Sequence, residues 1–454
     1  MRSSTRLKKQ RVVDIQDYYA LRIGPMWRGL REESWAFWWL CIYFFFEYVR
    51  PQSIYSVIDV LPWTQISLIA ALLTMRTDKT VTWVKSPANT VFILFYLLVF
   101  LSCLFAFHPA TSWGKISIVI NWIVAYFLIV MVVNSERRFF IFLLLFLLAN
   151  FKMSQFGFRS FAMRGFSFAG WGVSGSPGWF QNAGDFGLQM NIFAPLAAVF
   201  VYELRKYWSG IKKLLLYMLP ISALITIIAT SSRGAQLGLV GITLLYILRS
   251  RLGLKSLLTI LVLGWGLYQV LPAEMLEKFE TAGEDKTSQA RLKYWEFGMD
   301  VARENPVFGV GYENWLEYCW YKNPRGIEYG MACLDPHNTF IEAAAEIGIP
   351  GLSLYVIMLM LVLVINGRTR KKAKKLGNNF IFYMAHGLDA GLVGYMISSF
   401  FVTVLFYPMF WFQLALTVAL HALSMRMEVT SPDETASLDE PAKDAPDSLA
   451  HLYK

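Results

Sequence analysis

Charged side chains are scarce in this chain. Asp, Glu, Lys and Arg make up 16% of its 454 residues, whereas 56% are hydrophobic. This composition, with long apolar runs between short polar connections, excludes a soluble globular core and predicts an all-α polytopic membrane protein. About twelve transmembrane helices are expected, several short enough to be tilted or partly interfacial. The apolar runs lie at residues 35–49, 59–75, 88–107, 113–133, 139–151, 184–202, 214–230, 235–248, 254–272, 350–366, 380–402 and 405–424.

The common catalytic and metal-binding motifs are missing too. The chain has no Cys/His cluster with zinc spacing, no H-E-x-x-H, no G-x-S-x-G, no P-loop and no D-x-D pair. We therefore expect neither a metal nor another cofactor. Gly309-Val310-Gly311 contains a G-x-G, but without a strand–turn–helix context it predicts a turn rather than a dinucleotide site.

Basic residues outnumber acidic ones, 42 to 32, and the net charge is +10. Such a balance can indicate nucleic-acid binding, so the position of the charges decides. With the N-terminus placed in the cytoplasm, 29 of the 42 basic residues fall in cytoplasmic segments. The excess therefore indicates orientation in a bacterial inner membrane, with both termini cytoplasmic and membrane lipids, not nucleic acid, as partners. The basic cluster at 368–375 is interpreted as a cytoplasmic stop.

The expected spans divide the chain into five parts. No cleavable signal peptide is expected, and Asp14 to Leu30 are predicted to form a helix on the inner membrane surface. The acidic, Pro/Ser/Ala-rich end predicts disorder. The parts are a cytoplasmic segment at 1–34, nine transmembrane helices in 35–272, a periplasmic loop with short helices at 273–349, three transmembrane helices in 350–424 and a cytoplasmic tail at 425–454.

Only two outward connections are long. The first, 152–183, is rich in aromatic residues and glycine and contains Arg159 and Arg164, which predicts either contact with lipid phosphates or an aromatic girdle without a ligand. The second, the loop at 273–349, contains Cys319 and Cys333. A disulfide between them would close a loop of about 15 residues and add roughly 3 kcal/mol of stability, and the alternative is two small buried thiols.

Few charges lie within the expected spans, and the polar residues that could carry chemistry gather on the outward side. No internal repeat is found either. This distribution favours work at the membrane surface over a solute pathway through the bundle. His337 stands out among the five histidines, because it follows Asp335-Pro336 directly ahead of an expected amphipathic helix. It is either a general base or a satisfied loop histidine. Asn338, Glu342 and Glu346 form one polar stripe on that helix, which is either solvated or lines a cavity.

One arginine outside the spans is a candidate phosphate ligand. Arg233 lies in Ser231-Ser232-Arg233-Gly234, between two apolar runs that leave almost no room for a loop, and Gly234 is expected to allow the sharp turn. A guanidinium there can bind phosphate through two parallel hydrogen bonds, or it can simply reach to the interface and set the depth of the helix. Arg291 opens a predicted helix within the long loop.

Taken in order, these residues resemble the bacterial O-antigen ligases and the related Wzy-type polymerases. The resemblance covers about residues 170–365. A weaker similarity is Phe180-Gln181-Asn182, where the following Asp185 departs from the family pattern, and Glu47 to Gln52 resemble one branch. The main motifs are Ser232-Arg233-Gly234-Ala235 with Leu237-Gly238-Leu239, Arg291-Leu292 with Trp295, Pro306 to Gly311, and His337-Asn338 with Glu346-x-Gly348 and Gly351-Leu352.

The resemblance implies a GT-C-like membrane glycosyltransferase that moves a glycan from a polyprenyl-diphosphate carrier to an acceptor hydroxyl, with inversion and without metal. Arg233 and Arg291 would then stabilise the leaving diphosphate, with Arg159 or Arg164 as helpers. His337 would act as the base, oriented by Glu342 or Glu346. Asn182 and Asn338 are further candidates for substrate binding. The acceptor is a glycan, a lipid or a protein, and the alternatives are a repeat-unit polymerase and a flippase of lipid-linked glycan.

Overall fold

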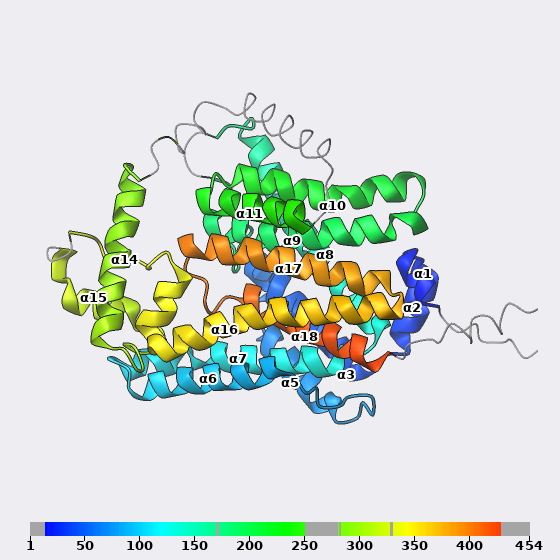
Figure 1. Ribbon diagram of the computed structural model, residues 1–454, viewed down its shortest axis with the longest axis horizontal. Helices are drawn as coiled ribbons and strands as arrows, with labels where there is room; N and C mark the ends of the chain where they lie inside the picture. The colour runs from blue at the N-terminus through cyan, green and yellow to red at the C-terminus, as the bar shows by residue number, and fades with distance from the viewer. Residues whose placement is uncertain (1–13, 169–171, 250–279, 281–282, 327–329, 428–454) are drawn as a thin grey trace, which may run out of the picture.

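The computed structural model describes residues 14–168, 172–249, 280, 283–326 and 330–427, and all regular secondary structure in these ranges is helical. Most helices run along the long axis of the molecule, side by side (Figure 1). The all-α polytopic fold predicted from composition is confirmed. After the two short helices near the N-terminus, the main helices are α3 (Trp35–Phe44), α5 (Trp63–Met75), α6 (Pro87–Leu104), α7 (Pro109–Val132), α8 (Glu136–Met163), α9 (Ala183–Leu204), α10 (Gly210–Ala229), α11 (Arg233–Arg249), α14 (Lys286–Glu304), α15 (Trp315–Lys322), α16 (Thr339–Leu376), α17 (Asn379–Ser398) and α18 (Pro408–Arg426).

Many of these helices begin at residues suited to a helix N-terminus. Pro87, Pro109 and Pro408 occupy the first turns of α6, α7 and α18, where their missing N–H costs nothing. Ser135 caps α8, and Asn338 caps α16 by accepting hydrogen bonds from two backbone N–H groups. The starts of these helices can therefore be predicted from the local sequence.

Among the described residues, eight helices are long and apolar enough to cross a membrane. They are α6, α7, α8, α9 with the turn that follows it, α10, α16, α17 with the turn that follows it, and α18. Helices α3, α5 and α11 coincide with three further predicted spans. With 10, 13 and 17 residues they are shorter than each of the eight helices above. The predicted span at 254–272 lies outside the described residues, so the number twelve stays a prediction.

The centre of the bundle is formed by α9, α17 and α18. In the apolar windows of α9 and α18, 89% and 83% of the residues are buried. Gly387 and Gly391 of α17 lie so close to Leu196 and Ile192 of α9 that an added Cβ would approach their backbone atoms to 3.2 Å or less. This close packing fixes α9 against α17, and the first turn of α9 lies at one end of the bundle.

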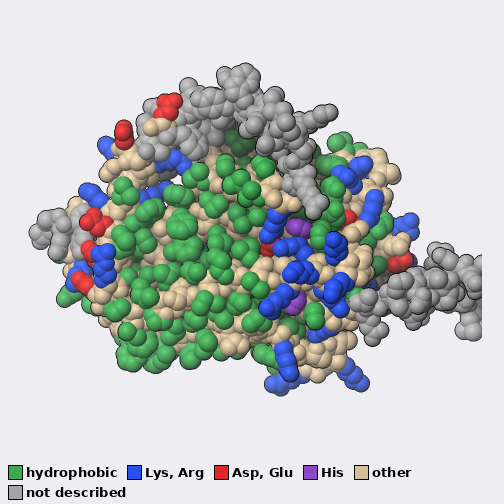
Figure 2. Space-filling model, viewed as in Figure 1, with side chains coloured by type: hydrophobic (Ala, Val, Ile, Leu, Met, Phe, Trp, Pro, Cys, Tyr) green, Lys and Arg blue, Asp and Glu red, His purple; other side chains and the backbone are tan. Residues whose placement is uncertain are grey.

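The two ends of the bundle differ in charge. Figure 2 shows an apolar surface across the middle, with Lys and Arg gathered toward the end where α1 (Ile15–Tyr19), α2 (Ile23–Arg31) and the C-terminus of α16 lie. That end is tied together by Arg138, which pairs with Glu33 at 2.5 Å and Asp78 at 2.9 Å. Helices α14 and α15 cover the opposite end (Figure 1).

Two boundaries differ from the sequence-based prediction. The segment from Asp14 forms two short helices, α1 and α2, instead of one, because Leu21 between them adopts a left-handed backbone with φ 50°. Helix α8 continues to Met163, although its apolar run ends at residue 151. About a third of the expected outward connection 152–183 is therefore helical.

Candidate functional site

The candidate site lies at the end of the bundle covered by α14. Here the α10–α11 turn, α14, the segment before α16 and the loop between α17 and α18 meet. His337 donates its backbone N–H to Thr403 Oγ1 at 2.9 Å, and Trp295 of α14 lies 6.4 Å from the ring of Phe401. Four segments that are far apart in the sequence thus meet at this end of the bundle.

Arg233 begins α11 and reaches across to α14. Its guanidinium donates to both oxygens of Asp285, at 2.8 and 3.3 Å, and to Ser288 Oγ at 3.0 Å. Arg233 holds the pKa of the Asp285 carboxyl well below its ordinary value. The turn before it differs from the prediction, because Ser231 (φ 50°), not Gly234, takes the left-handed conformation. Gly234 is needed for another reason: a Cβ there would lie 2.8 Å from Phe401.

Arg291 lies on α14, two turns after Asp285. Burial lowers the pKa of its guanidinium, the charge of Arg233 lowers it further, and Asp285 opposes both. Its Nε is buried without a hydrogen-bond partner in the described part of the chain. Asp285 is bound by Arg233 and lies within electrostatic range of Arg291. Two guanidinium groups near one carboxylate favour an anion beside them.

His337 is half-buried in the segment leading into α16 and lies within electrostatic range of Arg291. Its backbone is left-handed, with φ 48°, which is uncommon for a residue with a side chain. Its ring meets Tyr294 edge to face, with the ring centres 6.0 Å apart. Burial lowers the pKa of His337, Arg291 lowers it further, and Asp335 raises it. The imidazole is therefore neutral near pH 7 and able to accept a proton.

A compact subdomain of α14, α15 and the chain before α16 positions His337. Trp315 Nε1 donates to Leu334 O at 2.8 Å, and Asn323 Nδ2 donates to Met331 O at 2.9 Å. The structure joins Cys319 of α15 to Cys333 by a disulfide, four residues before His337. The alternative of two free thiols does not agree with this geometry.

Removing this disulfide is expected to destabilise the subdomain. The Cys319→Ser/Cys333→Ser variant should lose about 3 kcal/mol of stability, because the bond closes a loop of about 15 residues in the unfolded chain. Limited proteolysis between α14 and α16 measures the effect. The matched control is Cys41→Ser/Cys103→Ser, which replaces the two free cysteines. Equal cleavage of both variants would contradict a stabilising bond.

The polar stripe at the start of α16 contacts backbone rather than the His337 ring. Asn338 Oδ1 accepts from Phe340 N and Ile341 N, and Glu342 Oε2 accepts from Leu405 N at 3.1 Å. Glu346 accepts from the N–H groups of residues 313 and 315, at 3.0 and 3.1 Å. No hydrogen bond from either glutamate to the ring of His337 is found among the described residues. The role of Glu342 or Glu346 in orienting His337 therefore stays a prediction, and the carboxylate whose charge raises the pKa of His337 is Asp335.

The other candidates lie on different elements. Arg159 is exposed on α8 and Arg164 is exposed at its C-terminal cap, and neither is among the groups whose charge acts on Arg291 or His337. Asn182 caps α9, with its Oδ1 accepting from Gly184 N at 2.7 Å. These three residues have the stated structural positions, and their binding roles stay predictions.

Two further residues had no assigned role. Arg50 adopts a left-handed backbone, φ 49°, and its guanidinium lies 5.1 Å from the ring of Trp179, which in turn donates to Glu47. Asp185, in the first turn of α9, is only 7% exposed and lies close enough to Asp335 for their charges to repel. Buried carboxylates and left-handed non-glycine residues are enriched at functional sites. The sequence signal was present in both cases, as part of motifs noted only for their resemblance.

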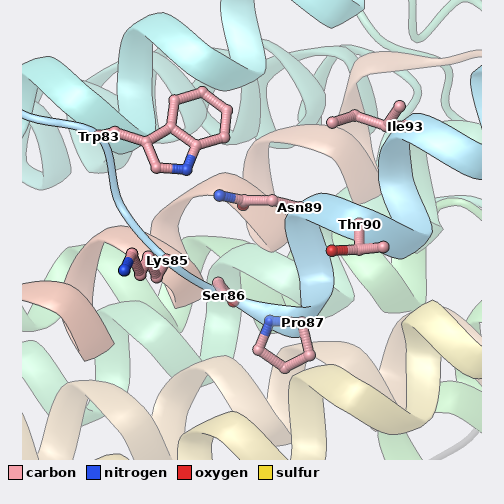
Figure 3. Close-up of a pocket in the computed structure, with 7 residues that line it drawn as sticks. All are labelled: Trp83, Lys85, Ser86, Pro87, Asn89, Thr90 and Ile93. Carbon is pink, nitrogen blue, oxygen red and sulfur yellow. The ribbon is translucent and has the colours of Figure 1, made fainter.

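A hollow of about 420 Å³ lies away from this site, at the start of α6 (Figure 3). Trp83, Lys85 and Asn89 are among the residues that line it. The Asn89 amide is engaged by Val84 O and by the hydroxyl of Tyr126, at 2.6 and 2.8 Å. This hollow holds no catalytic constellation, so the site stays with the two arginines and His337.

Residues 218–356 match the family model described as O-antigen ligase. The match runs from α10 into α16 and includes Arg233, Arg291 and His337. This part of the chain is similar to the O-antigen ligase family. The resemblance predicted from the motifs is thereby confirmed, while Arg50 and Asp185 lie outside the matched residues.

A curated relative comes from Rhizobium meliloti (strain 1021) and is named exopolysaccharide production protein ExoQ. It is 31% identical over 201 residues, which cover 40% of this chain and 43% of that protein. The chain therefore spans less than half the length of the curated relative it matches.

Proposed function

We propose that this protein transfers a glycan from a polyprenyl-diphosphate carrier to a hydroxyl group on the periplasmic side of a bacterial inner membrane. The observation that carries the proposal is the convergence of Arg233, Arg291 and His337 at one end of an apolar helical bundle. In a lipid-linked donor the diphosphate is the leaving group and lies at the membrane surface, where we expect the two guanidinium groups. The match to the O-antigen ligase family covers all three residues.

Each residue has a separate chemical task in this proposal. Diphosphate is a good leaving group that needs cations more than an acid, and the two arginines supply them. The acceptor hydroxyl needs a base, and a neutral His337 takes its proton as the oxygen attacks the anomeric carbon. Attack opposite the departing diphosphate inverts that carbon. No metal or other cofactor takes part.

The direct test is transfer by the purified protein. Polyprenyl-diphosphate-linked glycan is supplied with lipid A core, a polysaccharide and a protein as separate acceptors, and products are followed by mass. We expect transfer that persists in the presence of a metal chelator. Absence of transfer to every acceptor would overturn the proposal, and loss of transfer on chelation would contradict its metal-free part.

A repeat-unit polymerase is the second candidate, because the curated relative is named for exopolysaccharide production. It would use the same three residues, with a second lipid-linked glycan as the acceptor. Incubation with lipid-linked glycan alone separates the two functions, because a polymerase gives a ladder of products and a ligase gives none. A flippase would instead move lipid-linked glycan across proteoliposomes without forming a new glycosidic bond.

The proposed orientation is tested by labelling single cysteines in cells. With Cys41 and Cys103 replaced by serine, Asp300→Cys on α14 should react with a membrane-impermeant maleimide. Lys371→Cys near the end of α16 should react only after the cells are opened. The basic end of the bundle is expected inside because Lys and Arg are retained in the cytoplasm. The reverse labelling pattern would place the site in the cytoplasm and remove the argument for a periplasmic reaction.

A further inference from the structure

A buried carboxylate gathers cationic side chains at the basic end of the bundle, far from the candidate site. Asp389 of α17 has no exposed surface and accepts a hydrogen bond from Asn366 Nδ2 at 2.9 Å. Arg249 of α11 pairs with Asp389 at 2.7 Å, and Arg370 of α16 pairs with the same carboxylate oxygen. His386, one turn earlier on α17, lies within electrostatic range of both arginines. One negative charge thus holds two guanidinium groups, so the group is cationic.

The two guanidinium groups keep donors beyond those that bind Asp389. Each arginine pairs with Asp389 through its Nη1 atom, and a guanidinium carries further N–H groups. The side chains of Arg249 and Arg370 are 29% and 17% exposed, whereas that of Asp389 is fully buried. The carboxylate therefore fixes the two groups from the inside, while part of each one reaches the molecular surface. Paired guanidinium groups of this kind suit the oxygens of a phosphodiester.

Further basic side chains lie on the neighbouring face of α16. Arg368 is exposed and lies within electrostatic range of His421 on α18. Thr369 Oγ1 and His421 Nδ1 are 2.9 Å apart, so the histidine is fixed against α16. Figure 2 shows Lys, Arg and His side chains gathered where the apolar surface ends. The positive charge around Asp389 is therefore part of a wider cationic surface.

Exposed apolar residues lead to the arginines along both helices that flank α17. Helices α11 and α16 pack against α17, and they lie on either side of it in Figure 1. On each of them, exposed apolar side chains recur at helical spacing. The two stripes are Val240, Leu244 and Leu248, directly before Arg249, and Ile357, Met360 and Val364, one turn before Arg368. Arginines that follow lipid-facing stripes are expected at the depth of the lipid headgroups.

The apolar stripes favour a lipid over a soluble phosphate as the occupant. A soluble phosphate would gain only from the cationic side chains. A phospholipid gains from them as well, and its acyl chains cover apolar surface on α11 and α16. A headgroup with a net negative charge is attracted by the whole cationic surface.

We propose that Arg249 and Arg370, held in place by Asp389, bind the phosphodiester of an anionic phospholipid whose acyl chains lie along α11 and α16. This site is separate from the proposed transfer reaction and does not depend on it. Helix α11 begins at Arg233 in the candidate site and ends at Arg249 here. A bound lipid therefore holds the far end of the helix that carries Arg233.

Lipid binding by the purified full chain tests the proposal. The protein in a neutral detergent is titrated with phosphatidylglycerol at an ionic strength of about 0.15 M, which screens general surface attraction, and bound lipid is measured by native mass spectrometry. Arg249→Gln leaves Asp389 paired with Arg370 and should raise the Kd about tenfold or more, because a charge-assisted hydrogen bond is lost. Arg249→Lys keeps the charge but not the planar fork, so it should also bind more weakly than the wild type.

The matched control is Lys79→Gln, which removes an exposed charge beside Asp78 at the same end of the bundle. Its Kd should stay within about twofold of the wild-type value. Equal losses in Lys79→Gln and Arg249→Gln would show general surface attraction and overturn the site. Wild-type affinity in a folded Arg249→Gln variant, judged by its thermal transition, would overturn it too.

Competition distinguishes a lipid from other sources of phosphate. Inorganic phosphate in large molar excess should leave phosphatidylglycerol bound. Displacement of the lipid by inorganic phosphate would overturn the lipid assignment. Phosphatidylcholine, whose headgroup has no net charge, should bind more weakly than phosphatidylglycerol. Equal binding of the two lipids would contradict recognition of an anionic headgroup.

A crosslinking experiment uses the wild-type protein and needs no variant. Phosphatidylglycerol with a photoreactive diazirine in its headgroup is bound and irradiated, and labelled peptides are identified by mass. We expect labels on residues 244–249 and 364–371. Labels confined to other helices would overturn the site. Neither experiment measures glycan transfer, so failure of the lipid site would leave the proposed function untouched.

Discussion

The His337→Ala variant is expected to lose about 10²- to 10⁴-fold in kcat for glycan transfer, the usual contribution of a positioned general base. The ring is held by the left-handed backbone at 337 and by the edge of Tyr294. His337→Gln keeps a polar side chain of similar reach but cannot accept the proton, so it should be as inactive as the alanine variant. Donor binding should remain, because the arginines are untouched.

The pH dependence of the reaction gives a second test of the same role. A base is active when deprotonated, and burial with Arg291 lowers the pKa of His337 below its ordinary value of 6.5. The acid limb of kcat/KM should therefore lie below pH 6.5. Asp335 raises the pKa of His337, so Asp335→Asn should move the limb to still lower pH.

Replacing Arg291 should shift the acid limb of kcat/KM in the opposite direction. Arg291→Gln removes a charge that lowers the pKa of His337, so the acid limb of its residual activity should move to higher pH. Direct titration of the His337 ring by NMR should give shifts of the same signs in both variants. Identical acid limbs in the wild type and both variants would separate His337 from the proton transfer.

The sequence predicted the membrane class, the order of most helices and the three residues that converge. Apolar runs, caps such as Asn338 and charge position are local signals, and local signals survive in a single sequence. The length of α8 was also readable: Ala149, Met153, Gly157 and Phe161 recur every four residues and are all buried. The predicted end at residue 151 followed continuous hydrophobicity instead of the helical period, so it came too early.

Pairings across long sequence separations were not readable. Asp285 binds Arg233 from 52 residues away, and no spacing rule connects an acidic loop residue to a turn between two spans. The stripe of Glu342 and Glu346 was correctly placed on a helix. Its contacts with the backbone of Leu405, Glu313 and Trp315 depend on how the loops fold over that helix. The helix could be predicted from the local sequence, whereas the partners of its glutamates depend on the tertiary structure.

Arg233→Ala is expected to lower kcat/KM by about 10²- to 10³-fold, as the loss of one donor to a developing negative charge does in other enzymes. Arg233→Lys should be nearly as inactive, because an ammonium cannot reproduce the two parallel hydrogen bonds of the guanidinium. Arg233→Ala removes the contact with Asp285 and Arg233→Lys weakens it, so lost activity alone does not separate a catalytic role from a structural one.

Exchanging the two charges separates these roles. In Arg233→Asp/Asp285→Arg the ion pair between α11 and α14 can form again with reversed polarity. The thermal transition should recover relative to Arg233→Asp alone, because the repulsion between two carboxylates is removed. Transfer should stay lost, since the guanidinium would now project from α14 toward α11 instead of from α11 into the site. If transfer recovers together with stability, Arg233 only fastens α11 to α14, and the diphosphate must be held by other residues.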